Sequence, residues 1–219
     1  MARVIAEYPH LETLASAADV IGLEHVKAAL EKNGKVIVFS GHLANWEIMA
    51  PCLLKEGIAT DLVYRAPNNP WSDRMLDRYR SLNGKLRTLP KSRKGTRRLV
   101  ESLKDGHSVG ILIDQKYNEG LDIPFFGHPA MTSPAFVQLA QKYECSLIPF
   151  RVERVNGTQF RLSFFPAMRI LDNELQPLPV EGVMVEAHKM LESWISEKPQ
   201  QWLWLHRRWV SRNNSRPRP

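Results

Sequence analysis

Short apolar runs alternate with helix-like stretches along most of the 219-residue chain, and this alternation restricts the folds open to it. Strands that alternate with helices form a mostly parallel sheet covered by helices. The expected strands lie at 35–40, 60–65, 86–89 and 108–114. The expected helices between them lie at 45–56, 70–82 and 94–105. We therefore predict an α/β fold with a mixed, mostly parallel central sheet flanked by helices.

The remaining segments complete one domain over residues 1–210. Asn156-Gly157 lies between apolar runs at 146–154 and 158–166, a pattern typical of a hairpin that adds an antiparallel part to the sheet. The other expected elements are helices at 10–31, 133–143 and 180–197, with a long loop at 115–131. The polar, basic tail at 211–219 is predicted to be disordered.

The chain carries a net charge of +7, which favours an anionic partner such as a phospholipid, a phosphorylated substrate, an acidic carrier protein or nucleic acid. Cys52 and Cys145 lie in apolar stretches, which indicates buried thiols in a reducing compartment. No signal peptide and no apolar run of membrane-spanning length is visible in the sequence. We therefore expect no membrane-spanning helix in this chain.

The segment 40–47 places His42 five residues before Glu47, directly after the first apolar run. Residues five apart do not stack on one helix, so we place His42 in a loop, Asn45 at a helix N-cap and Glu47 in the first turn. There Glu47 can orient His42 as a general base. The alternatives are an ordinary loop histidine with a solvated glutamate, or a metal site. A metal would need further ligands, and no such spacing is present.

Candidate residues follow three of the predicted strands, and sites in open α/β sheets form at the carboxyl ends of strands. His42 follows the first strand, Arg65 ends the second, and Asp114 with Gln115 follows another. Arg65 can hold a phosphate, and Asn69 can bind substrate or shape its loop. Asp114 and Gln115 can hydrogen-bond a sugar or orient cationic residues. The alternatives are an exposed arginine beside a turn and a loop-capping aspartate.

Two further segments carry candidate residues. Cations without an acid crowd residues 85–98, and we select Arg93 as the contact to an anionic substrate, although a solvated surface is an equal alternative. In the apolar loop 120–127, Phe126 beside Gly127 can line a channel for an apolar chain or touch a bilayer, or the phenylalanines can be core. Tryptophans near the end suit a membrane interface, nucleic-acid stacking or the core. For Trp202 and Trp204 the core is the preferred interpretation.

Five segments in this order resemble the lipid A biosynthesis (lauroyl/myristoyl) acyltransferase family of Gram-negative bacteria, whose H-x4-D/E box is shared with glycerolipid acyltransferases. They are residues 41–47, 64–70, 111–115, 123–127 and 201–209. The resemblance implies a glycerolipid acyltransferase-like fold. It also implies transfer of a fatty acyl chain from acyl carrier protein, or acyl-CoA, to a hydroxyl of a lipid A precursor, without metal or cofactor. His42 would be the base and Glu47 its partner. The implied substrate-binding residues are Arg65, Asn69, Arg93, Asp114, Gln115, Phe126 and Gly127.

The resemblance also implies a location at the cytoplasmic face of the inner membrane. Family members usually carry an N-terminal membrane helix before the matching region, and this chain departs from that pattern. We expect either that it is a shortened form or that it binds the membrane peripherally. Two other functions stay open. One is acylation of a different bacterial glycolipid or aminolipid. The other is a non-catalytic basic module for anionic membrane or nucleic acid, which gives no reason for His42 and Glu47. We favour the enzyme and expect no nucleic-acid partner.

Overall fold

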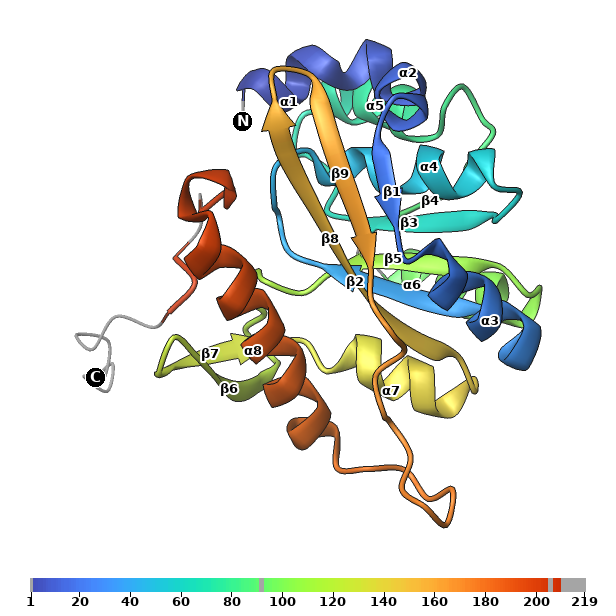
Figure 1. The fold of residues 1–219 in the computed structure, drawn as a ribbon, viewed down its shortest axis with the longest axis vertical. Coiled ribbons are helices and arrows are strands. Elements are labelled where there is room, and N and C mark those ends of the chain that lie inside the picture. The colour runs from blue at the N-terminus through green and yellow to red at the C-terminus, as the bar shows by residue number, and fades with distance from the viewer. Residues whose placement is uncertain (1, 91–92, 205–206, 210–219) are drawn as a thin grey trace.

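In the computed structural model, residues 2–90, 93–204 and 207–209 are described. The predicted disordered tail at 211–219 lies outside these residues. Seven of the described strands form one sheet in the order β1-β9-β8-β2-β5-β3-β4 (Figure 1). Their bounds are β1 Asp19–Ile21, β2 Val36–Ser40, β3 Thr60–Tyr64, β4 Thr88–Pro90, β5 Ser108–Leu112, β8 Ser146–Asn156 and β9 Gln159–Phe164.

Most neighbouring strands of this sheet are parallel. β8, β2, β5, β3 and β4 run in one direction, β9 is antiparallel to β8, and β1 is parallel to β9. The predicted α/β fold with a mixed, mostly parallel sheet is therefore confirmed. The hairpin at Asn156-Gly157 is confirmed too, because Gly157 takes a positive φ of 49° between β8 and β9.

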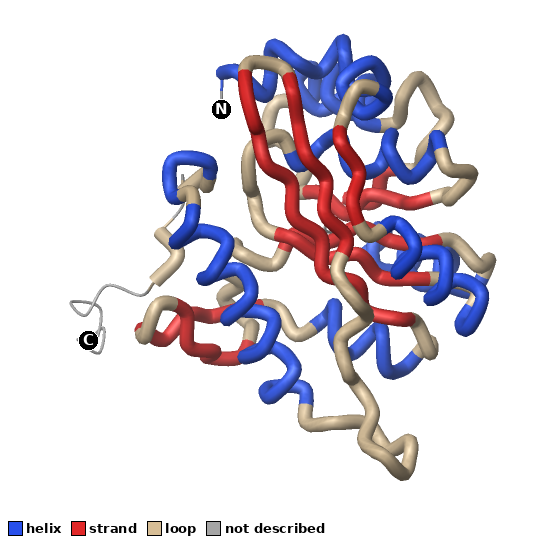
Figure 2. Tube along the Cα trace, viewed as in Figure 1, coloured by secondary structure: helices blue, strands red, loops and turns tan. Residues whose placement is uncertain are grey.

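Helices cover the sheet (Figure 2). Their bounds are α1 Ala2–Glu7, α2 Leu11–Ser16, α3 Leu23–Asn33, α4 Met49–Lys55, α5 Pro70–Arg80, α6 Arg93–Lys104, α7 Ala135–Lys142 and α8 Val180–Glu197. α3 and α7 pack on β2 and β8, whereas α6 packs on β3, β4 and β5. Every residue of β2 is buried, as expected for a central parallel strand covered by other elements.

The long helix expected at 10–31 is wrong. α2 ends at Ser16, β1 follows, and α3 begins only at Leu23. Gly22 interrupts the helical pattern with a positive φ of 74°. A Cβ atom at this position would lie 2.0 Å from the carbonyl oxygen of Phe164, so the backbone passes β9 where only glycine fits.

The loop expected at 115–131 is also wrong, because it contains the hairpin of β6 Leu121–Phe125 and β7 His128–Thr132 beside α8 (Figure 1). Phe126 and Gly127 form the turn, and both have positive φ, 51° and 71°, as a two-residue hairpin turn of type I′ requires. Pro124 faces Pro129 in this ladder. Hydrogen-bonded and non-hydrogen-bonded pairs alternate along an antiparallel ladder, and the pair at the turn, Phe125 with His128, is hydrogen-bonded. Pro124 and Pro129 therefore form a non-hydrogen-bonded pair, in which neither residue needs a backbone N–H.

The segment after His42 begins a helix as predicted. The Asn45 side chain accepts a hydrogen bond from the Glu47 backbone at 3.2 Å, which confirms the N-cap. A 3₁₀ turn, η2 Trp46–Ile48, leads into α4. Pro51 falls in the first turn of α4, where its missing N–H removes no hydrogen bond within that helix.

Candidate active site

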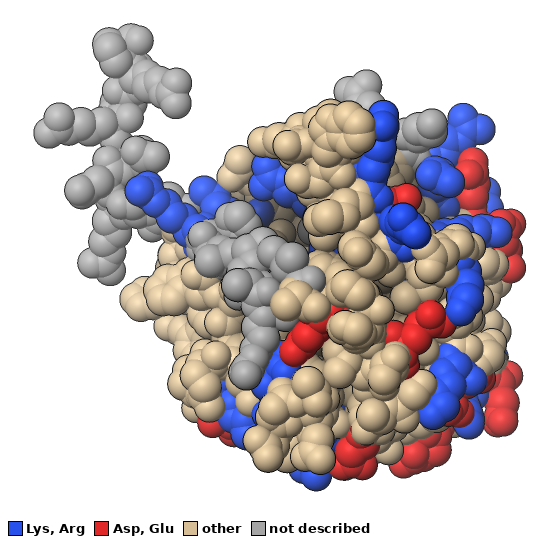
Figure 3. Space-filling model, turned by 90° about the horizontal axis from the view of Figure 1, so that it is seen from above, with Lys and Arg blue, Asp and Glu red and all other residues tan. Residues whose placement is uncertain are grey.

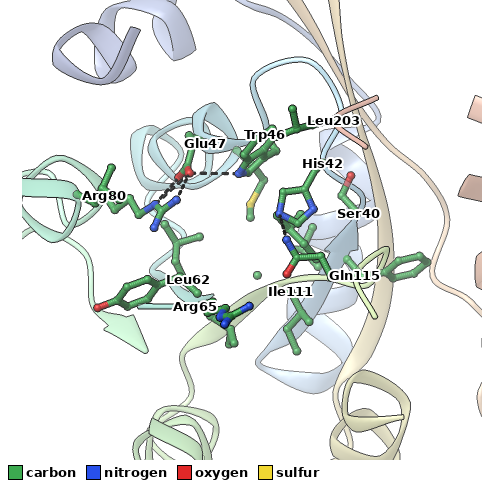
Figure 4. A pocket seen from close by; sticks show the side chains of 18 of the residues that line it. Ser40, His42, Trp46, Glu47, Leu62, Arg65, Arg80, Ile111, Gln115 and Leu203 are labelled. Atoms are coloured by element: carbon green, nitrogen blue, oxygen red, sulfur yellow. Dashed lines mark hydrogen bonds and ion pairs between the residues drawn. The ribbon is translucent and has the colours of Figure 1, made fainter. Parts of the chain in front are cut away.

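A pocket of about 440 Å³ opens at the carboxyl ends of β2, β5 and β3 (Figure 4). His42, Arg65 and Gln115 all line it, although each follows a different strand. The three predicted motifs therefore converge on one sheet edge, as sites in parallel α/β sheets do. Much of the remaining wall is apolar, and includes Val38, Met49, Leu62, Leu76 and Ile111.

The His42 imidazole is held by the carboxylate of Asp114. Nδ1 of His42 lies 2.6 Å from Oδ1 of Asp114, and the His42 backbone N–H donates to Oδ2 at 2.9 Å. The indole N–H of Trp202 donates to the same Oδ2 at 2.9 Å. Burial acts to raise the pKa of Asp114, but His42 and these hydrogen bonds lower it to about 2. An ionised carboxylate accepts only, so Nδ1 carries the hydrogen.

Nε2 of His42 is then the acceptor and lies on the pocket side. The Gln115 carboxamide donates to Nε2 at 3.2 Å (Figure 4). The Trp46 ring meets the His42 ring edge-on, with 4.7 Å between their centroids. The imidazole is thus fixed at one nitrogen by a buried carboxylate, while the other presents a lone pair beside an apolar pocket.

Glu47 also lines the pocket but contacts other groups. Its carboxylate accepts from the Tyr8 hydroxyl at 2.7 Å, from the Arg80 guanidinium at 2.6–3.1 Å and from the Trp46 indole at 3.2 Å. Within the described residues, no hydrogen bond joins Glu47 to the His42 ring. The predicted contact of Glu47 with His42 is therefore corrected. Asp114 makes that contact, because β5 lies next to β2 and brings Asp114 within hydrogen-bond distance of His42.

Arg80 is enclosed by the residues around Glu47. Its guanidinium lies over the rings of Tyr8 and Tyr64, at 5.7 and 5.4 Å from their centroids. Burial lowers the pKa of Arg80, but the Glu47 carboxylate outweighs burial and raises it, so the guanidinium stays charged. In Figure 4 the Glu47–Arg80 pair stands across the pocket from His42 and Gln115.

The other predicted binding residues differ in their positions. Arg65 is exposed and lines the pocket. Asn69 caps α5, and its side-chain oxygen accepts from the backbone of Trp71 at 2.9 Å and of Ser72 at 3.4 Å, so it shapes its loop. The side chain of Arg93, the first residue of α6, lies outside the described residues, and its predicted contact stays a prediction.

The structure also gives the positions of three further predicted binding residues, Phe126, Gly127 and Asp114. Phe126 and Gly127 form the β6–β7 turn and are not part of the pocket wall. The Phe126 ring packs toward Trp202, with 6.4 Å between centroids. Asp114 was predicted to bind substrate or orient cationic residues, yet only 2% of its side chain is exposed. Its hydrogen bonds to His42 and Trp202 therefore favour the orienting role.

Some residues that contact this site were not selected from the sequence as site residues, among them Tyr8, Trp46, Arg80 and Trp202. Trp202 belongs to a C-terminal segment that pairs with the His42 loop. The Ala44 N–H donates to the carbonyl of Gln201, and the Leu203 N–H donates to that of His42, both at 2.8 Å. The sequence signal for Trp202 is the tryptophan-rich segment 201–209, in which the core is the preferred interpretation for Trp202 and Trp204.

The described residues hold no group of His, Cys, Asp and Glu side chains suited to a metal ion. Their helices include none long and apolar enough to cross a membrane. Cys52 and Cys145 are buried and unpaired, as predicted, and burial raises the pKa of each thiol to about 11.

A histidine paired with a buried carboxylate at the edge of a parallel sheet, beside an apolar pocket, is typical of enzymes that activate a hydroxyl. Residues 2–211 match the family described as bacterial lipid A biosynthesis acyltransferase. The chain belongs to this family, and the resemblance found in its motifs is confirmed.

Individual relatives agree with this assignment. The chain is 27% identical to the lipid A biosynthesis lauroyltransferase of Escherichia coli (strain K12), over 93% of this chain and 65% of that protein. It is 28% identical to the palmitoleoyltransferase of the same organism and to the lipid A biosynthesis acyltransferase of Shigella flexneri, in each case over 89% of this chain and 62% of the relative. The chain thus spans slightly less than two thirds of the length of these relatives.

Proposed function

We propose that this protein transfers a fatty acyl chain from an acyl thioester, carried by acyl carrier protein, to a hydroxyl of a lipid A-type glycolipid. The observation that carries the proposal is the His42–Asp114 pair, with Nε2 of His42 turned to an apolar pocket. Family membership and the names of the relatives support an acyl transfer and a lipid A-type acceptor. Acyl-CoA is the other thioester of suitable chemistry.

In this mechanism, Nε2 of His42 takes the proton of the acceptor hydroxyl, which displaces Gln115 from that nitrogen. The hydroxyl oxygen attacks the thioester carbonyl, so a C–O bond forms and the C–S bond breaks. The protonated His42 then returns its proton to the leaving thiolate. Asp114 keeps the hydrogen on Nδ1 and stabilises the imidazolium that forms. No covalent acyl-enzyme intermediate is needed.

The remaining residues bind and position the substrates. The apolar wall around Leu62 and Ile111 suits an acyl chain, and the exposed guanidinium of Arg65 suits a phosphate of the acceptor. Glu47 acts through Arg80, since it fixes that guanidinium in the pocket wall with its hydrogen bonds. Acceptors of this class lie in a membrane, so we place the protein peripherally at the cytoplasmic face of the bacterial inner membrane.

The test is acyl transfer from lauroyl-acyl carrier protein to a tetra-acylated lipid A precursor, followed by mass spectrometry. The unmodified chain should add one acyl group, and His42→Ala should reduce the rate by at least about a thousandfold because the base is lost. His128→Ala is the control, since this exposed histidine lies at the β6–β7 turn outside the pocket.

Two results would contradict parts of the proposal. Transfer that survives in His42→Ala would exclude His42 as the base. A folded, unmodified chain that acylates other glycolipids but not the lipid A precursor would reassign the acceptor.

A further inference from the structure

One side of α5 presents both apolar and basic side chains to solvent. Trp71, Arg74, Met75 and Arg78 are all exposed, and their spacing of three and four residues places them on one side of the helix. Trp71 is 77% exposed and Met75 48% exposed. The Arg74 guanidinium lies 5.5 Å from the centre of the Trp71 ring. We call these four residues the α5 face.

The acidic residues of α5 point away from this face. Asp73 accepts a hydrogen bond from the Tyr64 hydroxyl at 3.2 Å, and Asp77 accepts one from Thr88. Arg78 donates to the neutral side chain of Asn83 at 3.3 Å. Among the described residues, no ion pair joins Arg74 or Arg78 to a carboxylate. The helix therefore separates its charges, with cations outward and carboxylates inward.

The α5 face lies next to the candidate active site. The loop before α5 supplies Arg65 and Asn68 to the pocket wall, and α5 itself supplies Leu76 and Arg80. Figure 1 draws α5 at the upper end of the molecule, and Figure 3 looks down on that end. There, Lys and Arg side chains lie in the upper right of the picture, together with some Asp and Glu side chains and beside uncharged atoms.

We propose that the α5 face binds the surface of an anionic phospholipid bilayer. An indole and a thioether beside guanidinium groups suit the headgroup boundary, where apolar groups enter the lipid and cations meet phosphates. An acidic protein would also attract Arg74 and Arg78, but it would leave the exposed Trp71 and Met75 unexplained. The preference for a bilayer also rests on the proposed function, whose acceptor is a membrane lipid.

The test is co-sedimentation of the full chain with vesicles of phosphatidylethanolamine containing phosphatidylglycerol. The double variant Trp71→Ala/Met75→Ala should weaken vesicle binding by about tenfold, because the apolar groups that enter the lipid are removed. Arg74→Glu/Arg78→Glu should weaken it at least as much, and added salt should have less effect on what binding remains.

Matched controls distinguish binding by the α5 face from nonspecific effects of exposed apolar side chains and of net charge. Leu175→Ala removes another exposed apolar side chain, 74% exposed, from the loop between β9 and α8. Lys32→Glu/Lys104→Glu makes the same change in net charge at exposed positions on α3 and α6. Both controls should bind vesicles like the unmodified chain.

Three outcomes would overturn the proposal: no vesicle binding by the unmodified chain, equal losses in the controls, or unchanged binding in both α5 variants. Loss of acyl carrier protein binding with vesicle binding intact would assign the α5 face to the carrier instead. Vesicle binding is measured without an acyl donor, so it can fail or succeed independently of the proposed reaction. Both α5 variants should still transfer acyl groups to an acceptor dispersed in detergent.

Discussion

At the scale of single residues, the proposed chemistry depends on which nitrogen of His42 carries the hydrogen. Asp114 settles this by accepting from Nδ1, and its own pKa of about 2 keeps it ionised throughout the range in which proteins work. Because the pKa of Asp114 is lower in the folded chain than its ordinary value of 3.8, the ionised carboxylate adds to the free energy of unfolding at pH values above 3.8. This contribution is lost as the pH falls from 3.8 to about 2.

Asp114→Asn should lower kcat by about a thousandfold to ten-thousandfold while the chain stays folded. An amide in this place can donate to Nδ1, which moves the hydrogen to Nε2 and removes the base from the pocket. Steady-state kinetics with circular dichroism measures both effects, and Asp122→Asn, an exposed aspartate on β6, is the control. A rate within tenfold of the unmodified chain would contradict the role given to Asp114.

Glu47→Gln should lower the free energy of unfolding, and its effect on activity should be the smaller of the two. The Glu47 and Arg80 side chains are 4% and 14% exposed, so removing one charge leaves the other buried and unpaired. Breaking such a pair costs roughly 3 kcal/mol of the free energy of unfolding, which urea unfolding would measure. Arg97→Gln breaks an exposed pair with Glu101 and should change stability by less than about 1 kcal/mol. Equal changes in the free energy of unfolding of the two variants would contradict the stabilising role given to the buried Glu47–Arg80 pair.

The partner of His42 could not be found from sequence spacing. His42 and Glu47 are neighbours in the chain, so the local pattern favoured their pairing, whereas Asp114 lies 72 residues from His42. Their contact exists only because β5 pairs with β2, an order that the sequence does not reveal. Tyr8 and Trp202 reach the site from near the two ends of the described chain. No local pattern could place them there.

At the scale of elements, the regular segments were predictable where local signals agreed. The apolar run of β2, the Asn45 cap and the turn at Asn156-Gly157 each have a short-range cause. The two failures arose where a tertiary contact overrode the pattern. Gly22 breaks a helical stretch so that its backbone can pass Phe164. The β6–β7 hairpin turns at Phe126, a residue type that rarely takes positive φ.

The β6–β7 hairpin and α8 are joined by a neutral buried histidine. Nδ1 of His188 lies 3.0 Å from the Pro124 carbonyl, and burial lowers the pKa of His188 to about 4. Unfolding exposes the ring and restores its ordinary pKa of 6.5. The unfolded chain therefore binds more protons between these values, so stability falls as the pH drops from about 6.5 to 4.

His188→Gln should flatten this part of the pH dependence. The shift in the pKa of His188 corresponds to roughly 3 kcal/mol of unfolding free energy lost over the interval. Urea unfolding at pH 7 and pH 5 would show a smaller difference in the variant than in the unmodified chain. His128→Gln, at an exposed position on β7, should keep the original difference. An unchanged slope in His188→Gln would assign the acid sensitivity to another group.

At the scale of the whole molecule, a buried carboxylate links the first helix, the His42 loop and the long strand β8. Glu7 accepts from the Asn45 side chain at 2.8 Å and forms an ion pair with Arg154 at 2.8 Å. Arg154 in turn packs over Phe160, 4.3 Å from its ring centre. The N-terminal helix α1 thereby supports the loop that carries the candidate base.

Glu7→Gln should lower the free energy of unfolding by about 3 kcal/mol, roughly 6–12 °C in Tm for a chain of this size, because Arg154 loses its buried partner. It should also lower kcat, since Asn45 holds the start of the helix after His42. Thermal unfolding and steady-state kinetics measure the two effects. Glu12→Gln breaks an exposed pair with Lys85 and should change both values little. A Tm equal to that of the unmodified chain would contradict the link.

The pocket draws its parts from separate loops, and this has a consequence for how its selectivity can change. The His42–Asp114 pair is fixed by β2, β5 and the C-terminal segment, whereas Arg65 and the residues up to Asn68 belong to the loop after β3. Substitutions in that loop leave the sheet and the paired base untouched. In the proposed reaction, the loop after β3 would set acceptor preference and the His42–Asp114 pair would transfer the proton, so one property can diverge while the other is retained.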